Sequence, residues 1–211
     1  MPRPRFEKLS EEKRARILTT SAKEFAAHGY DGASLNHILS EAGISKGAAY
    51  YYFDDKADLF ATVLGHYWQR VAGRIDVSEV RLDAAGFWDW AAEMYRQGLV
   101  LAEQEPWLLP LFKGLFRQRD VPGLPAGVAA ALSEVREWTR ALVVRGQEVG
   151  AVRSDVPLEL LLELLFAVDD VGDRWLMDNW DRVERAERER VSATMFAMVR
   201  RMLERPAEAC G

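Results

Sequence analysis

Residues 34–56, SLNHILSEAGISKGAAYYYFDDK, constrain the fold of this chain more than any other stretch. Two short segments of helical spacing flank Gly43, and the second segment opens with Ser45-Lys46-Gly47. This order is typical of a helix-turn-helix, in which the second helix enters the major groove of DNA. We therefore expect a DNA-reading module near the N-terminus, to which the remaining residues are attached.

Polar caps and glycines mark the ends of the helices around this module. A serine before an apolar segment accepts a hydrogen bond from a free backbone N–H of the first helical turn. A glycine just past the last apolar residue adopts the left-handed conformation that ends many helices. The sequence thus predicts helices that begin after Ser10, Ser34 and Ser45, helix ends at Gly29 and Gly43, and a fourth helix capped by Asp54 or Asp55.

Helical periodicity continues through the rest of the chain, and no segment shows the alternation of a strand. The long helix after the module carries apolar residues at i, i+3, i+4 and i+7. The predicted fold class is all-α, with an N-terminal three-helix helix-turn-helix module joined by this long helix to a C-terminal helical bundle that dimerises. The predicted domains are residues 1–56 for DNA binding and residues 57–211 for effector binding and dimerisation.

The charge of the chain depends on where along the sequence it is counted. The formal net charge is −5 and the pI about 5.4, which argues against a nucleic-acid binder. Residues 1–56, however, hold nine Lys or Arg and eight Asp or Glu, so the acidic excess lies in residues 57–211. Charges act strongly only within about 10 Å at 0.1 M salt. An acidic excess in residues 57–211 is therefore compatible with DNA binding by residues 1–56.

Several chemical functions are excluded by what the chain lacks. Its single cysteine, Cys210, cannot form an internal disulfide or a thiolate metal cluster. None of the three histidines stands in the Glu-x-x-His spacing of a di-metal bundle, and no glycine-rich phosphate loop is present. We expect no catalytic residues, no metal and no cofactor, and therefore no enzyme.

Targeting and membrane signals are also missing from the sequence. No apolar run reaches the roughly 20 residues that a spanning helix needs, and none follows the charged N-terminus as in a signal peptide. We therefore expect a cytoplasmic protein with no membrane partner.

The candidate DNA contacts are small, polar or cationic residues at the starts of the predicted helices. A recognition helix needs such groups at its N-terminus, where Gly47 lets the backbone approach DNA and Lys46 donates to guanine or phosphate. Tyrosine hydroxyls suit phosphate oxygens, and a capped helix start is a ready phosphate site. The predicted set is Ser34, Ser45, Lys46, Gly47, Tyr50, Tyr52 and Lys56.

Three further expectations concern neighbours of this set. Tyr51 and Phe53 are expected to be core residues, because so small a module needs apolar mass. Residues 2–5, Pro-Arg-Pro-Arg, have the composition of an arm for the minor groove, although we expect a disordered tail there. With Ala48 in the recognition helix, one possible polar contact to a base is missing. Sequence preference is then expected to depend on Lys46, Tyr50, contacts with thymine methyl groups and DNA shape.

Residues from about 12 to 60 resemble the N-terminal region of TetR-type transcriptional regulators, the tetracycline-repressor-like family. The matching pieces are ILTTSAKEFAAHGYDGASLNHIL and EAGISKGAAYYYFDDKADLF, with Gly-x-x-Tyr-x-x-Phe followed by Lys56. The later text GQEVGAVRSDVP also resembles a segment that links helices in this family. Ala49 departs from the pattern, since many relatives carry a bulkier apolar residue there. The resemblance implies an all-α homodimeric repressor whose C-terminal bundle binds an effector.

The C-terminal part is rich in tryptophan and contains an acidic run in an otherwise apolar helix. All seven tryptophans fall after residue 57, and aromatic walls suit a ligand pocket. A carboxylate among indole rings favours a cationic aromatic effector, whereas the leucine-rich stretch 158–166 favours a long apolar one. The simpler interpretation has the aspartates facing water or paired with Arg174 or Arg182. The candidate pocket residues are Trp88, Trp107, Trp138, Asp170, Asp173 and Trp175.

The last two predicted helices, about 158–180 and 183–204, are apolar on more than one face. One face can serve the chain's own core and another a second copy, which gives a four-helix interface. Two recognition helices about 34 Å apart then read a palindrome with half-sites one turn apart. The candidate interface residues are Leu161, Leu165, Met195, Met198 and Met202.

These observations predict a ligand-responsive repressor that binds a palindromic operator in double-stranded DNA as a homodimer. The small-molecule effector is not identified by the sequence. The alternative is a helical adaptor or small-molecule-binding protein that acts through protein contacts without binding an operator.

Overall fold

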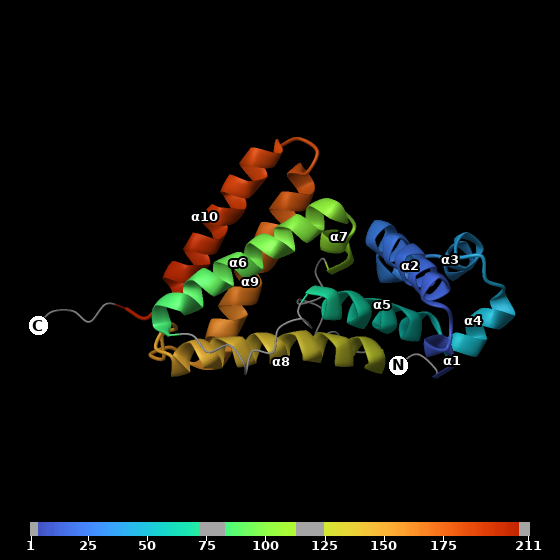
Figure 1. Ribbon diagram of the computed structural model, residues 1–211, viewed down its shortest axis with the longest axis horizontal. Coiled ribbons are helices and arrows are strands. Elements are labelled where there is room, and N and C mark those ends of the chain that lie inside the picture. The colour runs from blue at the N-terminus through green and yellow to red at the C-terminus, as the bar shows by residue number, and fades with distance from the viewer. Residues whose placement is uncertain (1–3, 72–82, 113–124, 207–211) are drawn as a thin grey trace, which may run out of the picture. The chain divides into compact units, whose positions relative to one another are not determined.

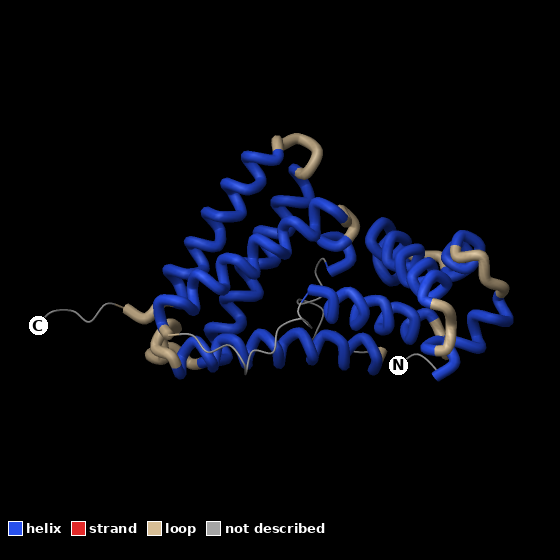
Figure 2. Tube along the Cα trace, in the orientation of Figure 1, coloured by secondary structure: helices blue, strands red, loops and turns tan. Residues whose placement is uncertain are grey.

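The computed structural model describes residues 4–71, 83–112 and 125–206, and every regular element in these ranges is a helix (Figure 1; Figure 2). The all-α fold class is therefore confirmed. In chain order the helices are α1 (Pro4–Glu7), α2 (Glu11–Gly32), α3 (Leu35–Glu41), α4 (Lys46–Tyr52), α5 (Lys56–Val71), α6 (Ala84–Gln104), α7 (Leu108–Phe112), α8 (Ala126–Glu148), α9 (Leu158–Asn179) and α10 (Arg185–Leu203).

The helices form two compact units. The first comprises Met1–Arg74 and Glu105–Val135, and the second comprises Ile75–Gln104 and Arg136–Gly211. The structural boundary thus differs from the functional boundary expected after residue 56, because α5 packs on α2 and belongs to the first unit. The assignment of DNA binding and effector binding to residue ranges stays a prediction.

The predicted helix caps are present. In each case a side-chain oxygen accepts a hydrogen bond from a backbone N–H of the first turn, which satisfies a donor that the helix cannot pair itself. Of the two aspartates considered for α5, Asp55 is the cap. The pairs are Ser10 with Lys13 at 3.4 Å, Ser34 with His37 at 3.3 Å, Ser45 with Ala48 at 3.2 Å and Asp55 with Asp58 at 2.8 Å.

Two glycines end helices in the way the sequence predicts. Gly29 has φ +67° and ψ 176°, which interrupts α2 before its last residues. Gly43 has φ +67° and follows α3 at the turn into α4. A side chain at either position would be strained, because L-residues rarely adopt this conformation.

The first unit has its core where α2, α3 and α5 meet. Ile17, Leu18 and Phe25 of α2 are buried with Ile38 of α3 and Val63 of α5. The apolar spacing predicted for the long helix is therefore the face of α5 that the unit buries. The ring of Trp107, just before α7, packs edge to face against the ring of Tyr67 of α5, with the ring centres 4.6 Å apart.

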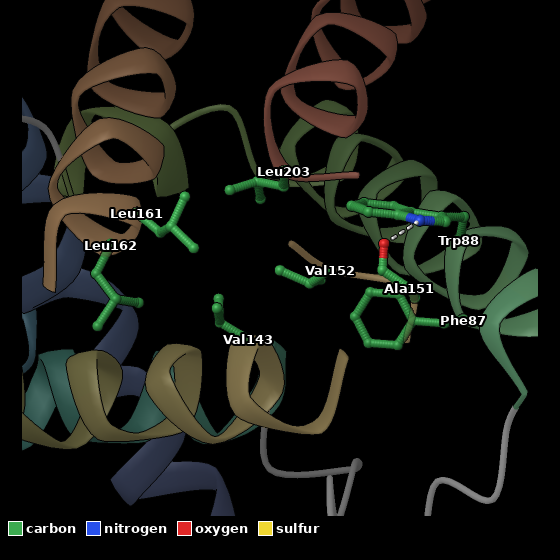
Figure 3. Close-up of a cluster of buried hydrophobic side chains, with 8 residues drawn as sticks. All are labelled: Phe87, Trp88, Val143, Ala151, Val152, Leu161, Leu162 and Leu203. Carbon is green, nitrogen blue, oxygen red and sulfur yellow. Dashed lines mark hydrogen bonds between the residues drawn. The ribbon is translucent and has the colours of Figure 1, made fainter. Parts of the chain in front are cut away.

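The second unit is organised around a separate apolar cluster (Figure 3). Side chains from α6, α8, α9 and the end of α10 converge there with the segment between α8 and α9. The indole Nε1 of Trp88 donates to the backbone oxygen of Ala151 at 3.3 Å, as the dashed line in Figure 3 shows. The buried members are Phe87, Trp88, Val143, Ala151, Val152, Leu161, Leu162 and Leu203.

Candidate nucleic-acid interface

α3 and α4 form the predicted helix-turn-helix. Between them, Gly43 turns the chain, and the backbone N–H of Ile44 donates to the oxygen of Leu39 at 2.9 Å. Ile44 is buried directly before the Ser45 cap, at the position where an apolar residue fixes the entry of the chain into a helix. The start of α4 is therefore fixed by a cap on one side and a buried anchor on the other.

α4 has one buried and one exposed face. Ala49 and the following Phe53 are buried, which confirms the core position predicted for Phe53. Ser45, Lys46, Gly47 and Tyr50 are exposed, so these candidate contacts share accessible surface. Apart from Gly47 itself, its chain neighbours and the adjacent backbone of α4, no described heavy atom lies within 4 Å of a Cβ built at Gly47, which leaves this position open to a ligand.

The core position predicted for Tyr51 is wrong. Tyr51 is 49% exposed, about as much as Tyr50 at 48%. At about 100° per residue, Tyr51 is rotated only about 40° from Gly47 around the helix axis. Tyr52 is instead the half-buried tyrosine, with its ring 6.4 Å from the ring of Phe6 at an edge-to-face angle.

Lys56 is engaged inside the module. Its Nζ donates to the backbone oxygens of Asp31 at 3.1 Å and Ala33 at 3.2 Å, and it lies 4.8 Å from the ring centre of Tyr30. These contacts satisfy carbonyl groups at the end of α2, where no helical partner is available. A role of Lys56 at DNA stays a prediction beside this structural role.

Ser34 has a buried partner that sequence reasoning missed. Its backbone N–H donates to Oε1 of the buried Glu24 at 2.9 Å. The other oxygen, Oε2, lies 3.6 Å from Nε2 of His37 and 3.8 Å from Nε2 of His28. A carboxylate at a helix N-terminus is stabilised by the free N–H groups there, so Glu24 holds α3 in position.

Residues 4–7 of the N-terminal segment form a helix, in contrast to the disordered tail expected for residues 2–5. Pro4–Glu7 forms α1, and Phe6 is only 1% exposed, with its ring 4.9 Å from that of Phe53. The physical reason is burial: Phe6 completes the aromatic packing behind α4. Pro2 and Arg3 lie outside the described residues.

Comparison with known proteins identifies the module. Residues 17–63 match the model for bacterial regulatory proteins of the tetR family. Over 157 residues the chain is 31% identical to the HTH-type transcriptional repressor AcnR of Corynebacterium efficiens, which covers 74% of this chain and 78% of the relative. The chain belongs to the tetR family. It is thus a DNA-binding transcriptional regulator, as the resemblance implied.

Solved structures agree with this tetR-family assignment at the level of the fold. A tetR family regulator from Shewanella sp. PV-4 superposes with a TM-score of 0.69 at 21% identity, covering 92% of this chain and 99% of the other. FadR of Bacillus subtilis in complex with stearoyl-CoA gives 0.70 at 16% identity, covering 88% and 96%.

The six candidate pocket residues of this tetR-family chain are divided between the two units. Trp107 lies in the first unit, and the other five lie in the second. Trp88 is a core residue, Trp175 is 40% exposed and Trp138 of α8 is partly buried. Asp170 pairs with Arg174 at 2.6 Å, which is the simpler interpretation given above for the acidic run.

Asp173 influences the pKa of Tyr95 together with Asp169, a member of the same acidic run, and sequence reasoning missed Tyr95. Burial raises the pKa of Asp169 on α9 to about 6. Burial, followed by the charges of Asp169 and Asp170, raises the pKa of Asp173 to about 7. Burial and the charges of Asp169 and Asp173 also raise the pKa of Tyr95 on α6. The second unit therefore holds two poorly solvated carboxyl groups coupled to a phenol.

The candidate dimer residues divide between core and surface. Leu161 is 1% exposed within its own unit, so it is not accessible to a partner. Leu165 and Met202 pack against the same core. The side chain of Met195 lies so close to Gly172 that a Cβ added to Gly172 would overlap it. Met198, in contrast, is 60% exposed. The exposed apolar side chains on α9 are Leu160, Leu164, Val171 and Trp175.

The described residues, 4–71, 83–112 and 125–206, contain neither a candidate membrane span nor a cluster of metal-ligand side chains. None of the helices in these ranges is both long and apolar enough to cross a membrane. In the same ranges, no group of three or more His, Cys, Asp or Glu side chains is arranged to hold a metal ion.

Proposed function

We propose that this tetR-family chain is a ligand-responsive repressor that binds a palindromic operator as a homodimer. The observation that carries the proposal is the capped, exposed face of α4, where Lys46, Gly47 and Tyr50 are accessible together. Such a face inserts into a major groove and leaves the phosphates on either side for polar neighbours. Repression is the activity named for the relative AcnR.

A second copy of the chain is the proposed occupant of the exposed apolar face on α9 and α10. Leu160, Leu164, Val171 and Trp175 recur at helical spacing along α9, and Met198 is exposed on α10. Contiguous apolar surface on a soluble protein favours a protein partner. A symmetric pair of two-helix faces forms a four-helix interface, and it also supplies the second recognition helix that a palindrome needs.

The proposed effector is a cation that binds the second unit near Asp169 and Asp173. Both residues are partly buried, and burial raises the pKa of each carboxyl group. A cationic ligand lowers the free energy of their charged forms, and nearby aromatic rings add cation–π attraction. The long apolar effector remains the alternative, and FadR with stearoyl-CoA is an example of such a ligand in a protein of this fold.

A movement of α6 caused by effector binding is transmitted to α5 through the residues that follow α6. α6 ends at Gln104 in the second unit, and the next residue, Glu105, belongs to the first unit. There Glu105 pairs with Arg70 of α5, and Trp107 contacts Tyr67. Displacement of α6 therefore pulls on α5, whose first residue, Lys56, holds the end of α2.

The size of the required effect can be stated. For a hundredfold loss of operator affinity, the effector must prefer the DNA-free conformation by about 2.7 kcal/mol. An effector that binds tightly at saturation and leaves the operator affinity unchanged contradicts this mechanism.

The function is tested by selecting bound DNA from a random duplex pool with the purified protein at about 0.1 M salt. An enriched palindrome with half-sites about one helical turn apart supports the proposal. A folded, dimeric protein that enriches no sequence contradicts it and favours the adaptor. The enriched duplex then serves as the probe in a screen of cationic and acyl-chain ligands.

A further inference from the structure

Arg5 of α1 stacks on the exposed tyrosine of the recognition helix. Its guanidinium carbon lies 4.0 Å from the ring centre of Tyr51. Both residues are exposed, so the pair is a feature of the surface of the module. A cation over an aromatic ring is attracted by the negative face of the ring, which restricts where the guanidinium goes.

The backbone of α1 is held in place independently of this pair. Phe6 is buried against Phe53 and Tyr52, and the backbone N–H of Leu9 donates to the oxygen of Phe6 at 3.1 Å. Glu7 pairs with Arg14 of α2 at 3.1 Å. The backbone position of Arg5 is therefore fixed by these contacts. The contact with the ring of Tyr51 then orients the Arg5 side chain.

Arg5 differs from the stacked arginines that pair with a carboxylate, and also from Arg188, whose guanidinium lies over Trp180 and donates to two backbone oxygens. Arg70 stacks on Tyr67 and Arg200 on Trp88, but each also pairs with a carboxylate, Glu105 or Glu204. No carboxylate in the described residues forms an ion pair with Arg5. Its positive charge is thus available to an external anion.

The position of Tyr51 on α4 indicates which anion Arg5 meets. Tyr51 is next to Tyr50 in sequence and about 40° from Gly47 around α4, so it borders the surface that enters the groove. A guanidinium that stacks through its flat face keeps its N–H edge for hydrogen bonds, and that edge matches a phosphate. We infer that Arg5 donates to a DNA phosphate beside the recognition helix and that Tyr51 is its positioning residue.

This contact places a cation at the edge of a module whose net charge is low. Residues 1–56 carry a formal charge of only +1, and the whole chain carries −5. Lys56 is occupied by backbone oxygens. A pre-positioned arginine at the edge of α4 therefore contributes to backbone binding irrespective of base sequence.

The test measures binding of the full chain to a random-sequence duplex at several salt concentrations between about 0.05 and 0.2 M. This probe needs neither the operator nor a dimer, so its outcome is separable from that of the proposed function. Arg5→Ala is expected to weaken binding about tenfold at the lowest salt and to reduce the slope of log K against log salt by about 0.9 for each bound subunit. Arg201→Ala, an exposed arginine on α10, is the matched control and leaves the slope unchanged.

Tyr51 variants test the positioning role in the same assay. Tyr51→Leu removes the ring, and its loss of affinity is expected to be largely absent when Arg5 is already alanine. Tyr51→Phe keeps the ring and is expected to bind like the unmodified chain. Far-UV circular dichroism and thermal melts of each variant establish that α1 and α4 remain folded.

Two results overturn the inference. If a folded Arg5→Ala variant binds with an unchanged salt slope, Arg5 does not contact a DNA phosphate. Equal losses for Tyr51→Phe and Tyr51→Leu show that the hydroxyl of Tyr51 acts directly, so that its positioning role is wrong.

Discussion

Arg70 of α5 donates to both carboxylate oxygens of Glu105, at 2.6 Å and 3.3 Å. The two residues are 35 positions apart in sequence, and Glu105 directly follows the last residue of α6. A bidentate pair of this kind restricts orientation as well as distance. The pair connects α5, which packs on α2 of the DNA-binding module, with Glu105, the residue at which the chain returns to the first unit after α6.

Loss of this pair is expected to uncouple the effector from DNA. An exposed ion pair contributes only about 0–1 kcal/mol to stability, so Arg70→Ala changes the melting temperature little and preserves operator affinity. Effector-induced release of the operator falls at least several-fold, because α5 no longer follows α6. Titration of the operator complex with an effector found by screening measures this. A variant that releases DNA at the same effector concentrations as the unmodified chain excludes the pair from the coupling.

Lys46→Ala is expected to weaken operator binding about tenfold and to reduce its salt dependence. Lys46 is exposed in the first turn of α4, where a lysine reaches phosphate or guanine. Affinities measured at several salt concentrations separate the two contacts, since a phosphate contact changes the slope by about 0.9 for each subunit. Weaker binding with an unchanged slope places Lys46 away from phosphate.

Stability is expected to fall as the pH rises from about 4 to about 7. The pKa values of Asp169 and Asp173 are raised from 3.8 to about 6 and about 7, so the folded chain keeps protons that the unfolded chain releases. A raised carboxyl pKa therefore favours folding at lower pH, and this advantage is lost over that range. Urea unfolding at pH 5.0 and pH 7.5 measures the difference.

The control for this pH dependence is the double variant Asp169→Asn with Asp173→Asn. It retains His66, whose pKa is lowered by burial and then by nearby arginines and which therefore destabilises the fold as the pH falls below 6.5. Comparison of the two proteins isolates the aspartates. If the double variant keeps the full pH dependence, the two carboxyl groups are not its source.

Met198→Glu is expected to convert a dimer into a monomer. Met198 is the exposed methionine of α10, and a charge buried at the proposed interface costs several kcal/mol without a partner. Sedimentation of both proteins measures the change. Ala193→Glu, exposed on the same helix but about 140° away around its axis, is the control. A dimer that persists in Met198→Glu moves the interface to another face.

Local structure of this chain could be predicted from sequence because its causes are local. Ser10, Ser34 and Ser45 cap helices through N–H groups three residues away, and Gly29 and Gly43 turn the backbone by their own conformational freedom. The helix-turn-helix and the family follow from the same short-range pattern of spacing and residue type.

Which apolar residues are buried was decided only by the tertiary structure. Helical spacing describes a face but does not say what covers it, so Leu161 was assigned to an interface although it is in the core, and Tyr51 to the core although it is exposed. Phe6 packs against Phe53 behind α4, directly after residues 2–5, which were expected to form a disordered tail. The Arg70–Glu105 pair and the Asp169, Asp173 and Tyr95 cluster likewise depend on helices far apart in sequence. Their energies arise from burial and proximity, which exist only once the helices pack.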